Sequence, residues 1–204
     1  MKKIFTLFII ITISFILTRC CSTENKTVNQ QTASTYLSDT VVYNKYLQQG
    51  SECAMQTGTV LIKNVSNAIA AKGSEYAIGF CSTKAIHLTD SMANAQHTTI
   101  KRVTDKPRNP YNKANEDELK YIQQLKNLVT SGEKPKPRLQ ETNEKIVGYY
   151  PIITTDMCMQ CYGDKSAIEA KTLAKLTQLY PADSATGYKS NQLRGLWVVE
   201  MMKN

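Results

Sequence analysis

The chain has 204 residues with a net charge of +8, made up of 25 Lys and Arg against 17 Asp and Glu, and 42% of it is hydrophobic. This composition is typical of one globular domain and excludes collagen-like, mucin-like and wholly disordered chains. Only two histidines are present, so a three-His zinc or two-His iron centre would depend on His87 and His97 alone. That scarcity argues against both kinds of centre.

The first nineteen residues have the pattern of a secretory signal peptide. Lys2 and Lys3 precede an apolar run that ends at Leu17. The fourteen residues of this run would rise roughly 21 Å as a helix, less than the ~30 Å hydrocarbon core, which favours a signal peptide over a retained span. Cys20 follows almost directly, in a pattern that resembles a bacterial lipoprotein signal, although Arg19 is a poor fit. We expect Cys20 to be acylated, with Cys21 as second choice and plain secretion as the alternative.

Export places the protein in the cell envelope, lipid-anchored and facing the periplasm or the cell exterior, with the membrane as one partner. Cleavage removes three basic residues and no acidic one, which takes the net charge from +8 to +5. The remaining basic residues are scattered, so no nucleic-acid partner is expected. The chain divides into the signal peptide (1–19), a flexible polar tether (20–35) and one domain (36–204) without internal repeats.

Apolar periodicity predicts a helical region at the start of the domain. A long helix runs from about Tyr36 to Lys72, and Gly73 follows as a helix stop. Gly50 and Gly58 weaken its middle, where a break is possible. A second predicted helix, residues 74–92, carries four residues on one face: Ile78, Cys81, Ala85 and Leu88.

Alternating and β-branched segments predict an antiparallel sheet after these helices, with strands at 98–104, 138–143, 145–154 and 193–202. Residues 106–115 contain two prolines and are predicted to form a non-helical loop. Capping boxes predict two more helices, one from Asn115 and Glu118 to Gly132, the other from Ser166 and Glu169 to Pro181. This order of elements predicts an α+β domain with a central antiparallel sheet.

The strongest chemical signal is the pair Cys158 and Cys161, predicted in a loop between a strand and a helix. Two thiols in this spacing followed by His attach haem c covalently, but Tyr162 occupies the position of that His. Taken alone, the pair indicates a local disulfide or a redox pair more readily than haem. A four-cysteine zinc site with Cys53 and Cys81 would need a second closely spaced pair, which the chain lacks.

Several separate stretches together resemble the Tll0287-like (DUF3365) family of exported haem c domains, which have a PAS-like α+β fold. The resemblance extends from about Gly50 to the C-terminus and rests on residues 77–82, 102 with 106–110, 149–152, 158–163, 180–183 with 187–188, and 193–197. It implies haem thioethers at Cys158 and Cys161 and an axial iron ligand at Cys81. Without the family, Cys81 would be read as a packing residue or as the disulfide partner of Cys53.

The resemblance also defines where this chain departs from the family. Family members normally present His where this chain has Tyr162, which can bind haem iron as a phenolate. Tyr162 and Cys81 are therefore the predicted iron ligands. His87 or His97 is the substitute ligand, unless each is a surface or hydrogen-bonded residue. Because Arg forms bidentate bonds to carboxylates, we expect Arg102 and Arg108 to pair with the haem propionates, unless they only anchor the loop.

The sequence thus predicts an envelope lipoprotein that binds haem c for electron transfer or redox sensing, together with a redox partner protein. No Ser/His/Asp array, paired-acid motif or Gly-rich phosphate loop supports an enzyme. The alternative is a haem-free, PAS-like sensory or binding domain with a Cys158–Cys161 disulfide. A thioredoxin-like module is disfavoured because no βαβ pattern precedes the cysteine pair.

Overall fold

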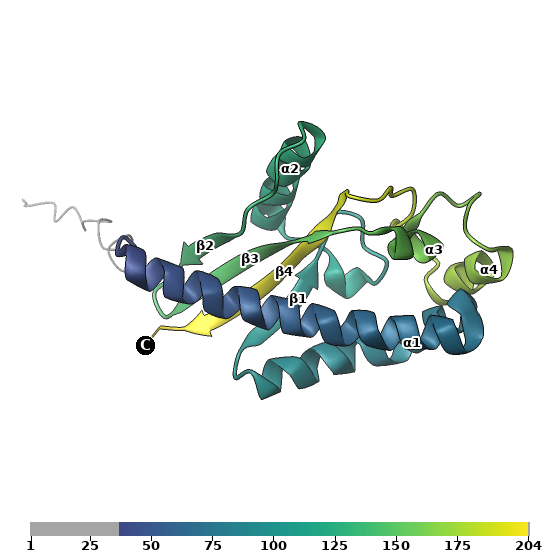
Figure 1. Cartoon of the computed structure of the whole chain (residues 1–204), viewed down its shortest axis with the longest axis horizontal. Coiled ribbons are helices and arrows are strands. Elements are labelled where there is room, and N and C mark those ends of the chain that lie inside the picture. The colour runs from purple at the N-terminus through teal and green to yellow at the C-terminus, as the bar shows by residue number, and fades with distance from the viewer. Residues whose placement is uncertain (1–36, 204) are drawn as a thin grey trace, which may run out of the picture. The chain divides into compact units, whose positions relative to one another are not determined.

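A single long helix, α1 (Thr40–Ala95), folds back on itself at Lys72 and Gly73 and forms two antiparallel arms (Figure 1). The structure is a computed structural model and describes residues 37–203. Gly73 has φ +79°, a left-handed conformation that favours glycine and ends the first arm as predicted. Residues 40–71 are called the first arm below, and residues 74–95 the second arm.

Gly50 and Gly58 do not break the first arm, contrary to the expectation from helix propensity. Both lie in regular helix, and Gly50 provides the space in which the ring of Tyr150 approaches the helix backbone. The packing of the arm against the sheet therefore overrides the local preference for a break.

The sheet has four strands in the order β1-β4-β3-β2, and all neighbours are antiparallel. The strands are β1 (Thr99–Val103), β2 (Arg138–Glu141), β3 (Lys145–Ile153) and β4 (Leu193–Met202). They confirm the four predicted strands, with ends that differ by at most two residues. β4 is central and almost wholly buried, because helices cover both faces of the sheet.

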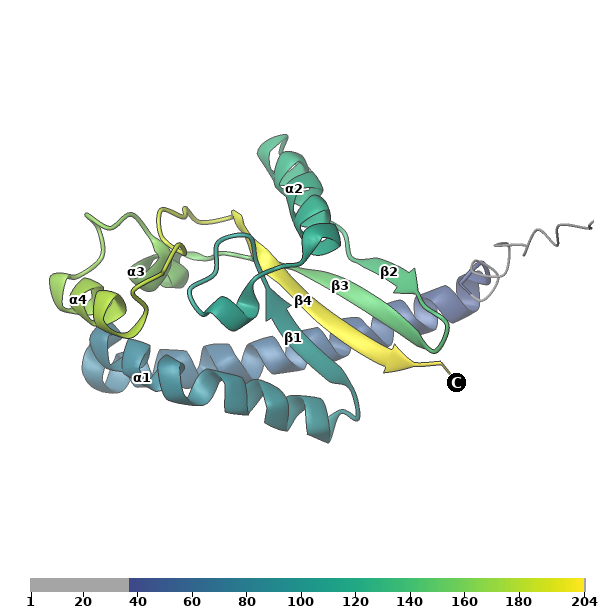
Figure 2. The same ribbon diagram turned by 180° about the vertical axis from the view of Figure 1, so that it is seen from behind.

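Each face of the sheet has its own apolar cluster, because successive strand residues point to opposite sides. On one face Tyr46 and Leu61 of the first arm pack against Tyr150 and Trp197. On the other face, Tyr149 packs with residues of α2 (Glu116–Thr130), which lies on the side of the sheet away from α1 (Figure 2). The fold is thus the predicted PAS-like α+β arrangement with a long N-terminal helical region and a central antiparallel sheet.

The capping box that opens α2 is confirmed by two reciprocal hydrogen bonds. The Glu118 N–H donates to Asn115 Oδ1 at 2.9 Å, and the Asn115 N–H donates to Glu118 Oε2 at 2.8 Å. The second predicted capping box is wrong, because α4 (Ala170–Leu179) has Glu169 as N-cap without a side-chain bond. Ser166 belongs to a preceding turn, in which the Asp164 carbonyl accepts from the N–H groups of Ala167 and Ile168.

Two predicted loops contain short helices. Residues 106–115 include a 3₁₀ helix, η1 (Pro110–Asn112), because proline fits the first helical position and the Asn109 side chain accepts from the Tyr111 N–H. The cysteine pair lies on η2 (Asp156–Cys158) and α3 (Met159–Tyr162) rather than in an open loop. Helices of three or four residues have no periodicity that a sequence could reveal.

The predicted signal peptide, the tether and the acylated Cys20 lie outside the described residues. Among residues 37–203, no helix combines the length and apolar character needed to cross a bilayer.

Candidate functional site

Cysteines from two distant segments, Cys81 and the pair Cys158 and Cys161, lie in one neighbourhood at the end of the molecule where α1 turns back. Cys161 of α3 is buried in an apolar cluster with Ile78 of the second arm and Leu176 of α4. Cys81 follows Ile78 by three residues and therefore lies on the same side of the helix. A negative charge on Cys81 or on Cys158 would raise the pKa of Cys161, which places both residues in the neighbourhood of that thiol.

The two deeper thiols of this cysteine cluster are neutral at pH 7. Burial raises the pKa of Cys161 to about 11, against the opposing charge of Arg108. Burial also raises the pKa of Cys81, and the charges of Arg102 and Arg108 oppose this shift. Because the thiolate is the nucleophile and the metal ligand, a cofactor would have to displace a proton at either residue.

All four cysteines within residues 37–203 are free. Cys53 lies on the first arm and is buried in the core, and the Cys53–Cys81 disulfide considered from the sequence is wrong. At ~1.5 Å of rise per residue, Cys53 lies roughly 30 Å and Cys81 roughly 12 Å from the turn at Gly73 along antiparallel arms (Figure 1). A disulfide needs Cα atoms within about 7 Å of each other.

Arg108 anchors the loop beside the cysteine cluster. It is 8% exposed, and its Nε donates to Asp183 Oδ2 at 3.0 Å in a buried ion pair. Its Nη2 donates to the carbonyls of Cys161 at 2.6 Å and Ala185 at 3.3 Å. The guanidinium is therefore engaged with the protein itself, which favours loop anchoring over a bond to a haem propionate.

Arg102 is half-buried, with its guanidinium carbon 5.8 Å from the centre of the Trp197 ring. Within residues 37–203 it forms no ion pair. It is close enough to Cys81 to lower the pKa of that thiol. Of the two residues predicted to pair with the propionates, Arg108 is already paired with Asp183, whereas Arg102 forms no ion pair with a carboxylate among the described residues.

The ring of Tyr162 is half-buried and contacts two guanidinium groups. The guanidinium carbons of Arg108 and Arg194 lie 4.3 Å and 4.7 Å from the ring centre. Tyr180 also belongs to this neighbourhood: burial raises its pKa most, and the charges of Cys81 and Tyr162 raise it further. In the sequence, Tyr180 and Arg194 were noted only as parts of stretches that resemble the family. No local sequence pattern indicates which residues they contact.

The two histidines are exposed, as the surface interpretation of each predicted. His87 lies on the second arm, and His97 lies in the turn before β1 with φ +51°. In the part of the chain that the structure describes, no three His, Cys, Asp or Glu side chains are grouped to hold a bare metal ion.

These features define a class of α+β domain. It has a central antiparallel sheet, a folded-back N-terminal helix and a cysteine pair beside the turn of that helix. The family model Tll0287-like matches residues 18–201, and the chain belongs to the Tll0287-like family. The crystal structure of the cyanobacterial haem protein Tll0287 has the same fold, with a TM-score of 0.59 and 20% identity. That match covers 78% of this chain and 96% of the other. No curated protein matches the sequence.

Proposed function

We propose that this chain is a haem protein of the cell envelope, in which Cys158 and Cys161 hold a c-type haem for electron transfer or redox sensing. The observation that carries the proposal is that the second arm, with Cys81 one helical turn after Ile78, packs beside this cysteine pair in the apolar cluster that Ile78 shares with Cys161. Membership of the family and the shared fold of a cyanobacterial haem protein support it.

The residues around the pair suit covalent attachment. Cys158 and Cys161 are three residues apart on a helical turn, so their thiols emerge on the same side, as two bonds to one porphyrin require. Ile78, Ile168 and Leu176 give the cluster apolar walls, which suit the face of a macrocycle. When bound, the haem would supply a one-electron redox couple.

Cys81 is the stronger of the two candidates for an iron ligand. The positive charges of Arg102 and Arg108 favour its thiolate, which offsets part of the effect of burial on the pKa. Tyr162 is the second candidate, but its ring is restrained by its contacts with Arg108 and Arg194. Arg102 would pair with a propionate, and Arg108 would position the loop through Asp183.

The proposed location rests on the N-terminal sequence. An acylated Cys20 would anchor the domain in the membrane through the tether 20–35, and a redox partner protein would meet it in the envelope; we propose no enzymatic activity. We expect the double variant Cys20→Ala, Cys21→Ala to lose fatty-acid label and leave the membrane fraction. Lipid anchoring would be contradicted if the wild type carried no fatty-acid label and the double variant stayed in the membrane fraction.

Haem attachment is tested by mass spectrometry of the protein from its native envelope. We expect one added haem mass that survives acid-organic extraction, and Tyr162→His should increase the loaded fraction by restoring the family residue. Tyr111→His, at a position 88% exposed, is the matched control and should leave loading unchanged. A colourless wild-type protein of bare polypeptide mass would instead support the haem-free alternative.

The role of Cys81 is tested by the spectra of the loaded protein. Cys81→Ser should change the ferric absorption and paramagnetic resonance spectra while the haem stays covalently attached. Cys53→Ser is the matched control, because Cys53 is buried in the core of the first arm away from the cysteine cluster. Identical spectra for wild type and Cys81→Ser would show that Cys81 does not bind the iron.

A further inference from the structure

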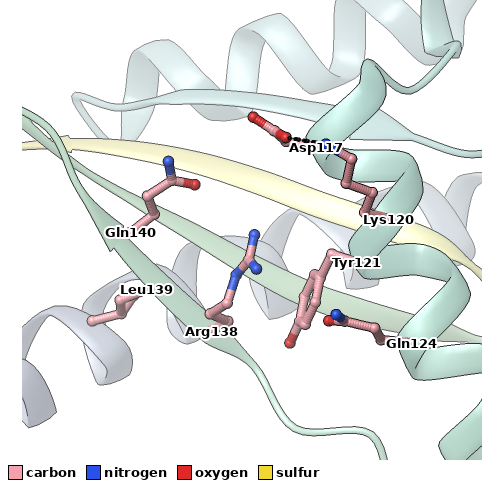
Figure 3. A pocket seen from close by; sticks show the side chains of 7 residues that line it. All are labelled: Asp117, Lys120, Tyr121, Gln124, Arg138, Leu139 and Gln140. Atoms are coloured by element: carbon pink, nitrogen blue, oxygen red, sulfur yellow. Dashed lines mark hydrogen bonds and ion pairs between the residues drawn. The ribbon is translucent and has the colours of Figure 1, made fainter. Parts of the chain in front are cut away.

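A cavity of about 500 Å³ lies between α2 and β2, on the sheet face opposite the first arm (Figure 3). Lys120, Tyr121 and Gln124 reach it from α2, because residues three and four apart share one helix face. Arg138 and Gln140 reach it from β2, because alternate residues share one face of a strand. Its volume is in the range of small-molecule sites.

Arg138 is the unusual residue of this cavity. Its guanidinium carbon lies 4.1 Å from the ring centre of Tyr121 and 4.9 Å from that of Tyr149. Its Nε atom is buried and has no hydrogen-bond partner. No ion pair joins Arg138 to a carboxylate anywhere in residues 37–203. A half-buried cation without a counter-anion is unfavourable unless something else supplies the charge.

The neighbouring tyrosines do not supply a negative charge, although the guanidinium of Arg138 donates a hydrogen bond that lowers the pKa of Tyr149. The hydroxyl of Tyr121 donates to the Lys136 carbonyl at 2.7 Å, and that of Tyr149 donates to Gln140 Oε1 at 3.1 Å. Burial raises the pKa of both tyrosines, so neither phenol carries a negative charge at pH 7.

The acidic residue of the cavity is also engaged. Asp117, at the exposed edge, accepts from Lys120 Nζ at 3.3 Å, and the two charges offset each other (Figure 3). The cavity therefore retains the positive charge of Arg138, held at a fixed place by two aromatic rings.

We propose that this cavity binds a small organic carboxylate, which accepts hydrogen bonds from the guanidinium of Arg138. The planar guanidinium matches the two oxygens of a carboxylate. Gln140 has its carbonyl oxygen bonded to Tyr149, which leaves its amide NH₂ to donate to the same ligand. The ring of Tyr121 and the side chain of Leu139 form the apolar wall for the rest of the ligand. A single unpaired cation suits a carboxylate better than a phosphate, which carries more charge.

This site is separate from the proposed haem site. None of its lining residues belongs to the cysteine cluster or to the apolar cluster around Cys161. Binding of a carboxylate is therefore expected in protein with or without haem, and failure of either proposal leaves the other intact.

The test follows the Nε–H resonance of Arg138 in ¹⁵N-labelled, purified protein during titration with sodium benzoate and sodium succinate. Sodium phosphate and sodium chloride at matched ionic strength are the competing anions. We expect a saturable shift of this resonance with at least one carboxylate. No saturable shift with either carboxylate, or tighter binding of phosphate, would overturn the proposal.

Variants assign the effect to Arg138. Arg138→Gln should weaken carboxylate binding by about tenfold or more, measured by calorimetry, because a charge-assisted hydrogen bond is lost. Lys134→Gln is the matched control: it removes one positive charge from a nearby exposed position and should leave binding unchanged. Arg138→Lys keeps the charge and removes the planar fork, and it should also weaken binding by about tenfold. Unchanged affinity in both Arg138 variants, or an equal loss in Lys134→Gln, would overturn the assignment.

Discussion

The two arms of α1 meet the rest of the protein in different ways. The first arm buries large side chains against the sheet, among them Tyr46 and Leu61. The second arm buries only three residues near the turn, Ser74, Ala77 and Ile78, whereas Cys81, Ala85 and Leu88 stay half-buried. A single helix therefore provides a well-packed core in one arm and an incompletely covered apolar face in the other.

The contacts of the two arms differ in chemistry as well as in extent. Apolar packing dominates the first arm, whereas near the turn the second arm combines the apolar contacts of Ile78 with polar contacts such as the 2.6 Å hydrogen bond between the hydroxyls of Ser74 and Thr172. The Arg108–Asp183 ion pair holds the adjoining loop. Regions with few buried apolar contacts open more easily, and binding sites are drawn from such regions. The cysteine cluster therefore lies beside the less completely buried of the two arms.

The largest expected effect comes from breaking the polar anchor at the cysteine end. Arg108→Met leaves Asp183 buried without its cation, and the carbonyls of Cys161 and Ala185 lose a donor. We expect the free energy of unfolding to fall by about 3–5 kcal/mol, measured by urea denaturation. Arg102→Met removes the same charge from a half-buried residue without an ion pair and should cost less than about 1 kcal/mol. Equal losses in the two variants would contradict the anchoring role.

The next effect concerns pH and the buried thiol of Cys161 in haem-free protein. Its pKa is about 11 in the folded state against an ordinary value of 9.0. Between these values the unfolded chain releases a proton that the folded chain keeps, so stability falls as pH rises from about 9 to 11. The loss is on the order of 2 kcal/mol. Cys161→Ala should remove this part of the pH dependence, and identical profiles for wild type and variant would contradict it.

The smallest effect compares one glycine from each arm. A Cβ at Gly50 would lie 2.1 Å from the hydroxyl oxygen of buried Tyr150, so Gly50→Ala should destabilise by about 1–3 kcal/mol. At Gly79 the nearest atom is Lys175 Cε at 3.9 Å, so Gly79→Ala should stabilise by up to about 1 kcal/mol through helix propensity. Thermal unfolding of both variants measures the contrast. Destabilisation by Gly79→Ala would mean that the second arm is packed as closely as the first.

Much of the secondary structure could be predicted from the sequence because its causes are local. Gly73 ends a helix through its own backbone freedom, and the Asn115–Glu118 box closes over three residues. Alternating or β-branched segments marked the four strands. The exceptions also have local reasons: Ser166 turned out to lie in a turn, and η2 and α3 are too short to show a period. The continuity of α1 through Gly50 was decided by Tyr150, a residue one hundred positions away.

For the sites, the sequence by itself determined the pair Cys158 and Cys161, because their spacing is a local property. The approach of Cys81 to that pair was implied only by family resemblance, and the tertiary structure shows it through the fold-back of α1. The partner of Arg108 was likewise decided by the tertiary structure, since Asp183 is 75 residues away in the sequence. The Arg138 cavity was not predicted at all. It exists because α2 packs on the face of the sheet beside the edge strand β2. Contacts between distant segments leave no periodic trace in the sequence.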